Sequence, residues 1–140
     1  MFPADLYLAI GSNLGNRAAN ISRSVALLEE RLGCSVSAIS PVAVTKSIGF
    51  SGPDFLNCIV RFRCSKAPLT ILKICKEIER EMGRTDSPEY DENGNRVYHN
   101  RIIDIDILLY GRKTVNTPEL TIPHPQIETR PYVKELLSQM

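Results

Sequence analysis

One segment of the chain constrains the fold more than any other: residues 101–110, which have the sequence RIIDIDILLY. Acidic and apolar side chains alternate along this segment, and alternate side chains of a β-strand point to opposite faces of a sheet. The segment therefore predicts a central strand over residues 102–110. Asp104 and Asp106 should lie side by side on one face of that strand. Four apolar side chains should point into a helix-covered core on the other face: Ile103, Ile105, Ile107 and Leu109.

The two aspartates indicate a site for a hard cation. Residues that are two positions apart on a strand, such as these, have their Cβ atoms about 7 Å apart. Mg²⁺ is commonly held by one or two carboxylates together with waters and substrate phosphates. The alternative is a half-buried strand with a solvated face, but two like charges side by side on one face cost electrostatic energy. The pattern therefore favours the metal site.

The remaining apolar periodicity predicts the order β-α-β-β-α-β. Further strands are expected at 6–10, 36–44 and 56–64, and amphipathic helices over 18–32 and 68–82. A turn at 111–114, short extended pieces near 115 and 120–122, and a helical tail from 131 should follow. This order is the split-βαβ, ferredoxin-like α+β arrangement. Its antiparallel sheet carries both helices on one face and leaves the other face for ligands.

Composition limits the class of protein. The 140 residues fit one domain, 1–140. Seventeen basic and sixteen acidic residues give a net charge of +1, too balanced for a protein held to nucleic acid mainly by counterion release. No apolar run reaches the roughly 18 residues of a membrane span, and no leader pattern is present. We therefore expect a soluble, cytoplasmic monomer that binds neither nucleic acid nor membrane. The cysteines, whose spacing favours buried free thiols over a metal or disulfide site, are Cys34, Cys58, Cys64 and Cys75.

Two connections and two short motifs carry the remaining polar features. Residues 45–54 and 84–100 lack a core pattern, and such long connections usually serve function. We expect them to close over a substrate, with tolerated insertions as the alternative. Residues 11–16, GSNLGN, match no phosphate-binding fingerprint. They favour a tight turn with Asn13 or Asn16 as the helix N-cap. His124 lies between two prolines and fits a structural turn or a ligand contact equally well.

Together these segments resemble the 6-hydroxymethyl-7,8-dihydropterin pyrophosphokinase family over nearly the whole chain. The resemblance implies a ferredoxin-like fold and a reaction of folate biosynthesis. That reaction moves the β,γ-pyrophosphoryl group of ATP to the hydroxymethyl oxygen of the pterin and leaves AMP. The matching segments are 7–16 (YLAIGSNLGN), 54–57 (DFLN), Glu79 with Gly83 and Arg84, Arg101 with 104–110 (DIDILLY), and 120–125 (LTIPHP) before Arg130.

The resemblance also implies roles for individual residues. Catalysis would rest on Arg84, Arg101, Asp104 and Asp106, with two Mg²⁺ ions held by the two aspartates. ATP would be contacted by Glu79, Ile107, Thr121, His124 and Arg130. The pterin would be bound by Thr45, Ile48, Phe55, Asn57 and Tyr132.

Lys46 and Glu119 are among the departures from the family pattern, and two other functions stay open on the residues alone. Lys46 stands where family members often have a proline, and Glu119 where some have an ATP-binding arginine. An RNA- or metabolite-binding module of the same fold is one alternative. Its central strands would need exposed aromatic residues for base stacking, and this chain offers arginines and aspartates there. A Mg²⁺-dependent hydrolase that uses the same aspartates is the other.

Overall fold

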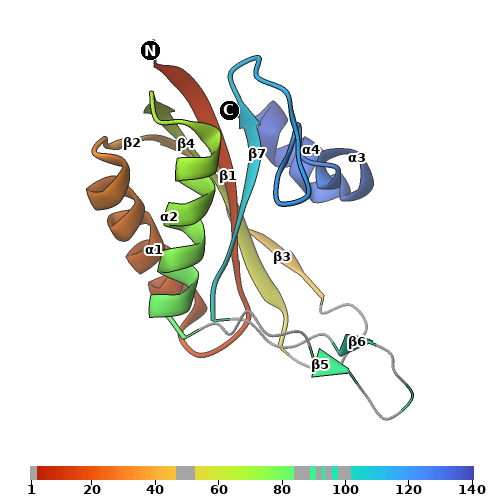
Figure 1. Ribbon diagram of the computed structural model, residues 1–140. Coiled ribbons are helices and arrows are strands. Elements are labelled where there is room, and N and C mark those ends of the chain that lie inside the picture. The colour runs from red at the N-terminus through yellow and green to blue at the C-terminus, as the bar shows by residue number, and fades with distance from the viewer. Residues whose placement is uncertain (1–2, 47–52, 84–88, 91–92, 94–95, 98–101) are drawn as a thin grey trace.

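The computed structural model describes residues 3–46, 53–83, 89–90, 93, 96–97 and 102–140. Its central feature is an antiparallel sheet with the strand order β2-β4-β1-β7, in which β3 also pairs with β4. Figure 1 shows α1 and α2 on one side of this sheet and the C-terminal helices on the other. The elements of the sheet and its two long helices are β1 (Ala4–Ser12), α1 (Arg17–Leu32), β2 (Val36–Ile39), β3 (Ala43–Thr45), β4 (Phe55–Cys64), α2 (Pro68–Glu81) and β7 (Asp104–Tyr110).

The predicted ferredoxin-like α+β fold is confirmed by this order of strands and helices. Smaller elements complete it, and no described helix is long and apolar enough to cross a membrane. The four cysteines are free thiols, three of them buried. The smaller elements are β5 (Glu89–Tyr90), β6 (Arg96–Val97), β8 (Val115–Asn116), β9 (Thr121–Ile122), α3 (Gln126–Thr129) and α4 (Pro131–Ser138).

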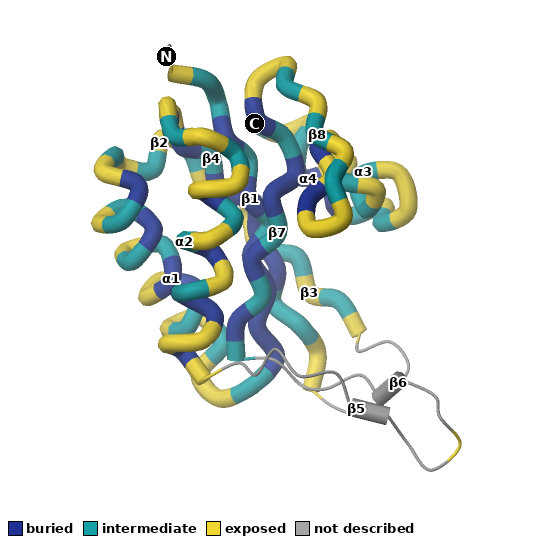
Figure 2. Tube along the Cα trace, viewed as in Figure 1, coloured by how far each residue is buried: buried dark blue, intermediate teal, exposed yellow. Residues whose placement is uncertain are grey.

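The main core lies between the sheet and the helix pair α1 and α2, and Figure 2 shows buried residues in both layers. Alternate residues of β1 and β4 supply the sheet side, among them Leu8 and Phe62, which are fully buried. Residues at helical spacing supply the other side, among them Leu28 of α1 and Ile78 of α2. Both periodicities therefore converge on one apolar layer.

The segment predicted as one strand over 36–44 forms two strands, because the strand conformation is interrupted at Ser40 and Pro41. The Ser40 amide donates to the Ile59 carbonyl at 2.8 Å, and the Ser40 hydroxyl accepts from the Ile59 amide at 2.8 Å. Pro41 has no N–H to donate and cannot continue a ladder. The serine side chain thus replaces a backbone partner where the strand pairing is interrupted.

A register shift in β7 changes the predicted alternation. Leu8 of β1 pairs with Ile107 and Tyr7 pairs with Leu109, so Leu108 is an extra residue on β7, as in a β-bulge. Ile103, Ile105 and Ile107 pack on the helix side as predicted. The prediction for Leu109 was wrong, because alternation fails beyond the bulge. Tyr110 joins the helix-side core in its place, and Leu108 and Leu109 belong to a cluster on the other face.

That second cluster shows that the other face is not left entirely to ligands. Val133 and Leu136 of α4 pack against Ile59 of β4 and Leu108 of β7. Helix α4 therefore covers one part of this face, and Asp104 and Asp106 lie at the other end of β7.

The buried hydroxyl of Tyr110 gives a test of this packing. It lies near two carbonyl oxygens, 3.0 Å from that of Cys64 and 2.7 Å from that of Lys66. Tyr110→Phe should lower the free energy of unfolding by about 1–2 kcal/mol, because buried carbonyls lose their donor. Urea denaturation followed by circular dichroism measures this change. Tyr7→Phe, on the neighbouring strand and half-buried, is the matched control, and an equal effect of both substitutions would contradict the assignment.

Candidate functional site

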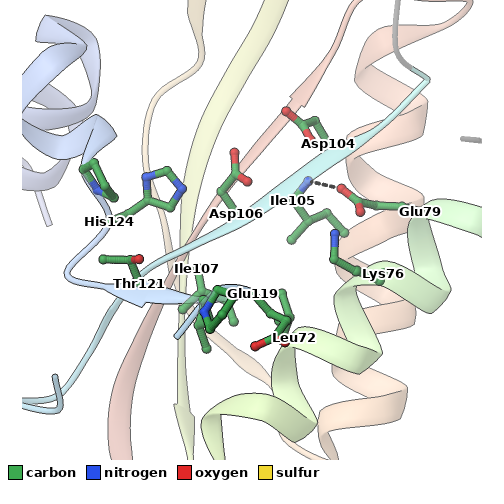
Figure 3. Close-up of a pocket in the computed structure, with 13 residues that line it drawn as sticks. Leu72, Lys76, Glu79, Asp104, Ile105, Asp106, Ile107, Glu119, Thr121 and His124 are labelled. Carbon is green, nitrogen blue, oxygen red and sulfur yellow. Dashed lines mark hydrogen bonds between the residues drawn. The ribbon is translucent and has the colours of Figure 1, made fainter. Parts of the chain in front are cut away.

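A pocket of about 320 Å³ lies over the exposed end of β7. Figure 3 shows that α2, β7 and the segment around β9 contribute its walls. The lining joins residues from distant parts of the sequence: Leu72, Lys76 and Glu79 of α2, residues 104–107 of β7, and residues 118–121, 124 and 125. Six of the residues predicted to act on the nucleotide or metal line this pocket: Glu79, Asp104, Asp106, Ile107, Thr121 and His124.

The two aspartates lie on one side of β7, as the alternation predicts. Both are half-buried, whereas Ile105 between them is 5% exposed and packs in the main core. Figure 3 shows both carboxylates on the same side of the strand. On β1, Asp104 faces Gly11 and Asp106 faces Ala9. Both partners are small residues, so β1 itself places no bulky side chain beside the carboxylates.

Glu79 is held inside the wall of this pocket. Its side chain is 1% exposed, and one carboxylate oxygen accepts the Ile105 amide proton at 2.8 Å, the dashed line in Figure 3. A buried carboxylate is costly unless hydrogen bonds compensate it. The bond therefore attaches α2 to β7 at the residue between the two aspartates.

His124 faces the same pocket from the segment that follows β9. The Gln126 amide donates to its Nδ1 at 3.0 Å, so the neutral imidazole carries its proton on Nε2. Burial lowers the pKa of His124, and the nearby positive charge of Arg130 lowers it further, against an opposing effect of Asp104. His124 is therefore a neutral polar group of the pocket near pH 7. Thr121 lines the pocket beside it.

A second group of predicted residues lies across the sheet from the aspartates. Asp104 pairs with Gly11, and Gly11 pairs with Asn57 of β4, so these residues form one row on one face. Neighbouring strands are about 4.8 Å apart, which puts the Cα atoms of Asp104 and Asn57 about 10 Å apart. The Asn57 side chain is 8% exposed and donates from Nδ2 to the Thr45 hydroxyl at 2.8 Å.

Gly11 is needed where it stands, although its backbone is not left-handed. A Cβ atom at this position would come within 2.8 Å of the Asn57 Oδ1 and 3.7 Å of the Phe55 ring. The carboxamide of Asn57 therefore lies over the backbone of Gly11. Motif analysis did not assign Gly11 a role, and the available signal was a glycine inside a strand pattern, which marks close approach.

Other predicted residues lie outside the pocket or outside the described chain. Arg130 and Tyr132 stand together at the start of α4, where a guanidinium nitrogen of Arg130 is 3.3 Å from the Tyr132 hydroxyl. Neither lines the pocket, although Arg130 is close enough to act on His124. Arg84, Arg101 and Ile48 lie outside the described residues.

Two charged residues of the pocket wall bear on nucleotide binding. Glu119 does line the pocket, so an acidic group stands at the position where some family members have an ATP-binding arginine. Lys76 lines it too, and sequence analysis missed it. The signal was its position on α2, three residues before Glu79 and four after Leu72, which is the spacing of one helix face.

Comparison with known proteins adds the following. A family model described as 7,8-dihydro-6-hydroxymethylpterin-pyrophosphokinase matches residues 7–140. A 2-amino-4-hydroxy-6-hydroxymethyldihydropteridine pyrophosphokinase of Porphyromonas gingivalis is 42% identical over 139 residues, 98% of this chain and 90% of that protein. A Bacillus subtilis protein of the same name is 32% identical over 135 residues, 96% of this chain and 76% of its own length. A folate synthesis bifunctional protein of Arabidopsis thaliana is 37% identical over 130 residues, 92% of this chain and 25% of that protein.

The lowered pKa of His124 predicts a pH dependence of stability. The unfolded chain binds this proton near pH 6.5, and the native imidazole binds it only at lower pH. The stabilisation from this residue is therefore present above pH 6.5 and is lost as the pH falls through the native pKa.

Histidine NMR titration, with His124→Gln to identify the resonance, should give a pKa below 6.5 for His124. Between pH 7.5 and 5.5, the free energy of unfolding should fall more steeply for the parent than for His124→Gln. Parallel pH profiles for the two proteins would contradict the burial effect.

Proposed function

The chain belongs to the 7,8-dihydro-6-hydroxymethylpterin-pyrophosphokinase family, a pyrophosphokinase family of folate biosynthesis, and we propose how its residues carry out this transfer. ATP is the donor, and the β,γ-pyrophosphoryl group moves to the hydroxymethyl oxygen of 6-hydroxymethyl-7,8-dihydropterin. The products are AMP and the pterin diphosphate. The observation that carries the assignment of residues is the row Asp104–Gly11–Asn57, which sets a pair of carboxylates beside an amide that can read a flat heterocycle.

Asp104 and Asp106 are the metal ligands in this proposal. Their carboxylates are half-buried, lie on one side of β7 and pair across the ladder with the small residues Gly11 and Ala9. Hard carboxylate oxygens suit Mg²⁺, which keeps waters and takes substrate phosphates as further ligands. Among the described residues no group of three acidic, histidine or cysteine side chains is placed to hold a metal ion. Two Mg²⁺ ions would neutralise phosphate charge and lower the pKa of the attacking hydroxyl.

The pocket beside the aspartates would take the nucleotide. Thr121 and His124 offer polar contacts, and the backbone of Ile107 offers one to adenine. Glu79 acts at the same site by holding β7 through the Ile105 amide. Arg130 would contact ATP from the start of α4, and Arg84 and Arg101 would steady the phosphates as the bond breaks, the electrostatic part of phosphoryl transfer.

The pterin would lie over the other end of the row. The Asn57 Nδ2 donates to Thr45, and its Oδ1 lies over Gly11, where it can accept from the polar edge of the pterin. Phe55 and Tyr132 would serve as aromatic walls, with the backbone of Thr45 to Ile48 alongside. Stacked aromatic faces supply affinity and a few polar groups supply orientation. The hydroxymethyl group would then point along the row toward Asp104.

The metal assignment is tested with Asp104→Asn and Asp106→Asn. Each substitution removes a negative charge without a change in size and should lower Mg²⁺-dependent AMP formation by about 100-fold or more. Asp5→Asn, on β1 at the far end of the sheet and partly exposed, is the matched control and should keep the parental rate. Parental activity in Asp104→Asn would refute the assigned role. AMP released from ATP without pterin would favour a hydrolase instead.

The pterin assignment is tested with Gly11→Ala. The added methyl group would displace the Asn57 carboxamide, since the ideal position is 2.8 Å from its oxygen. The KM for the pterin should rise about 10-fold, comparable to one lost hydrogen bond, whereas the KM for ATP should not change. Asn57→Ala should give a similar rise, and the double variant should be no worse than either single one. Additive losses would mean that Gly11 acts on something other than Asn57.

A further inference from the structure

The connection between β1 and α1 does more than cap a helix. Of the two predicted caps, Asn16 fills that role, since its Oδ1 accepts the Ala19 amide proton at 3.1 Å. Asn13 does not. Its side chain is fully buried and donates from Nδ2 to the carbonyl of Pro53 at 3.2 Å, forty residues further along the chain.

Arg17 makes a parallel contact from the first residue of α1. Its guanidinium donates to the carbonyl of Asp54 at 2.6 Å. Two consecutive carbonyls, those of Pro53 and Asp54, are thus held by two side chains of the same connection. We call this pair of contacts, from Asn13 and Arg17, the carbonyl clamp.

The clamp acts where the sheet ceases to hold β4. The ladder between β1 and β4 ends with Ser12 paired to Leu56, so Phe55 has no backbone partner on β1. On its other side Phe55 pairs with Thr45 of β3. Beyond the end of the backbone ladder, the side chains of the clamp therefore bind the segment that leads into β4. This segment directly precedes Phe55 and Asn57.

We propose that Asn13 and Arg17 are positioning residues for the acceptor substrate. They fix the backbone that leads into Phe55 and Asn57 and so set the affinity for the flat heteroaromatic acceptor rather than for the nucleotide. The inference rests on the proposed function, because it takes Phe55 and Asn57 as the residues that contact the acceptor. The nucleotide pocket shares no residue with the clamp.

The same turn supplies a control for a purely structural role. Asn20 donates from Nδ2 to the Ser12 hydroxyl at 3.2 Å and to the Leu14 carbonyl at 2.8 Å, so it stabilises the turn from within. Asn20→Ala should lower stability without a selective effect on the acceptor. Arg23, exposed on the same helix, offers Arg23→Ala as the match for Arg17→Ala.

The experiment is calorimetry of 6-hydroxymethylpterin binding in the presence of Mg²⁺ and a non-hydrolysable ATP analogue, together with steady-state kinetics. Asn13→Ala should raise the pterin Kd about 10-fold and Arg17→Ala about 3-fold, with the analogue's Kd within twofold of the parent. The pterin KM should rise more than kcat falls. In a Phe55→Ala background the Asn13→Ala effect should largely disappear. Equal losses for pterin and nucleotide, or full additivity with Phe55→Ala, would overturn the proposal.

Amide hydrogen exchange of the ligand-free protein gives a second readout that needs no substrate. Arg17→Ala, the milder variant, should speed exchange at residues 55–57 and leave residues 59–62 unchanged, and Arg23→Ala should change neither. Unchanged exchange at 55–57 would refute the clamp even if Asn13→Ala fails to fold. A parent protein that binds the nucleotide analogue but no pterin would refute the proposed acceptor, and the exchange pattern would then decide the clamp alone.

Discussion

The pairing of β1 with β4 on one side and β7 on the other is the constraint on which the rest of the site depends. The two registers meet at Gly11, which pairs with Asp104 and with Asn57. A shift of one residue in either ladder would turn one of these side chains into the helix-side core, because successive residues of a strand face opposite sides. The buried alternation of β1, with Leu6, Leu8 and Ile10 almost without exposure, makes such a shift costly. The core therefore fixes the relative placement of the two halves of the site.

The register shift at Leu108 divides β7 into two parts with different tasks. Before the shift, aspartates alternate with core isoleucines, and the aspartates line the pocket on the outer face. Leu108 lies on the same outer face, as alternation predicts, but it is fully buried under α4 together with Ile59. The extra residue turns Leu109 onto this face as well, and bulges commonly re-aim side chains in this way near active sites. The same strand can therefore present carboxylates at one end and an apolar docking surface at the other.

The sequence pattern predicts those features of the fold and site that depend on residues close together in the chain. The placement of Asp104 and Asp106 follows from alternation alone, as does the β-α-β-β-α-β order. The predictions fail where contacts with residues distant in the sequence determine the structure. Helix α4 covers part of a face expected to be open. Leu109 points to the other face because of a bulge in the pairing of β7 with β1. Pro41, by contrast, was a readable signal for the break between β2 and β3. The pocket joins Glu79, Thr121 and His124 only through tertiary packing, so their common location required a family resemblance rather than periodicity.

The charge of the pocket bears on which form of the nucleotide it would accept. Glu79, Asp104, Asp106 and Glu119 all line it, against the cation of Lys76. His124 adds little positive charge near pH 7, because burial lowers its pKa. A triphosphate alone would meet carboxylates at close range, where the local dielectric makes repulsion stronger than in water. In the proposed reaction, bound Mg²⁺ would reverse that balance, since the same carboxylates would then attract the ions that carry the phosphates. The acidic side chains of the pocket would therefore favour the metal complex of the nucleotide over the free anion.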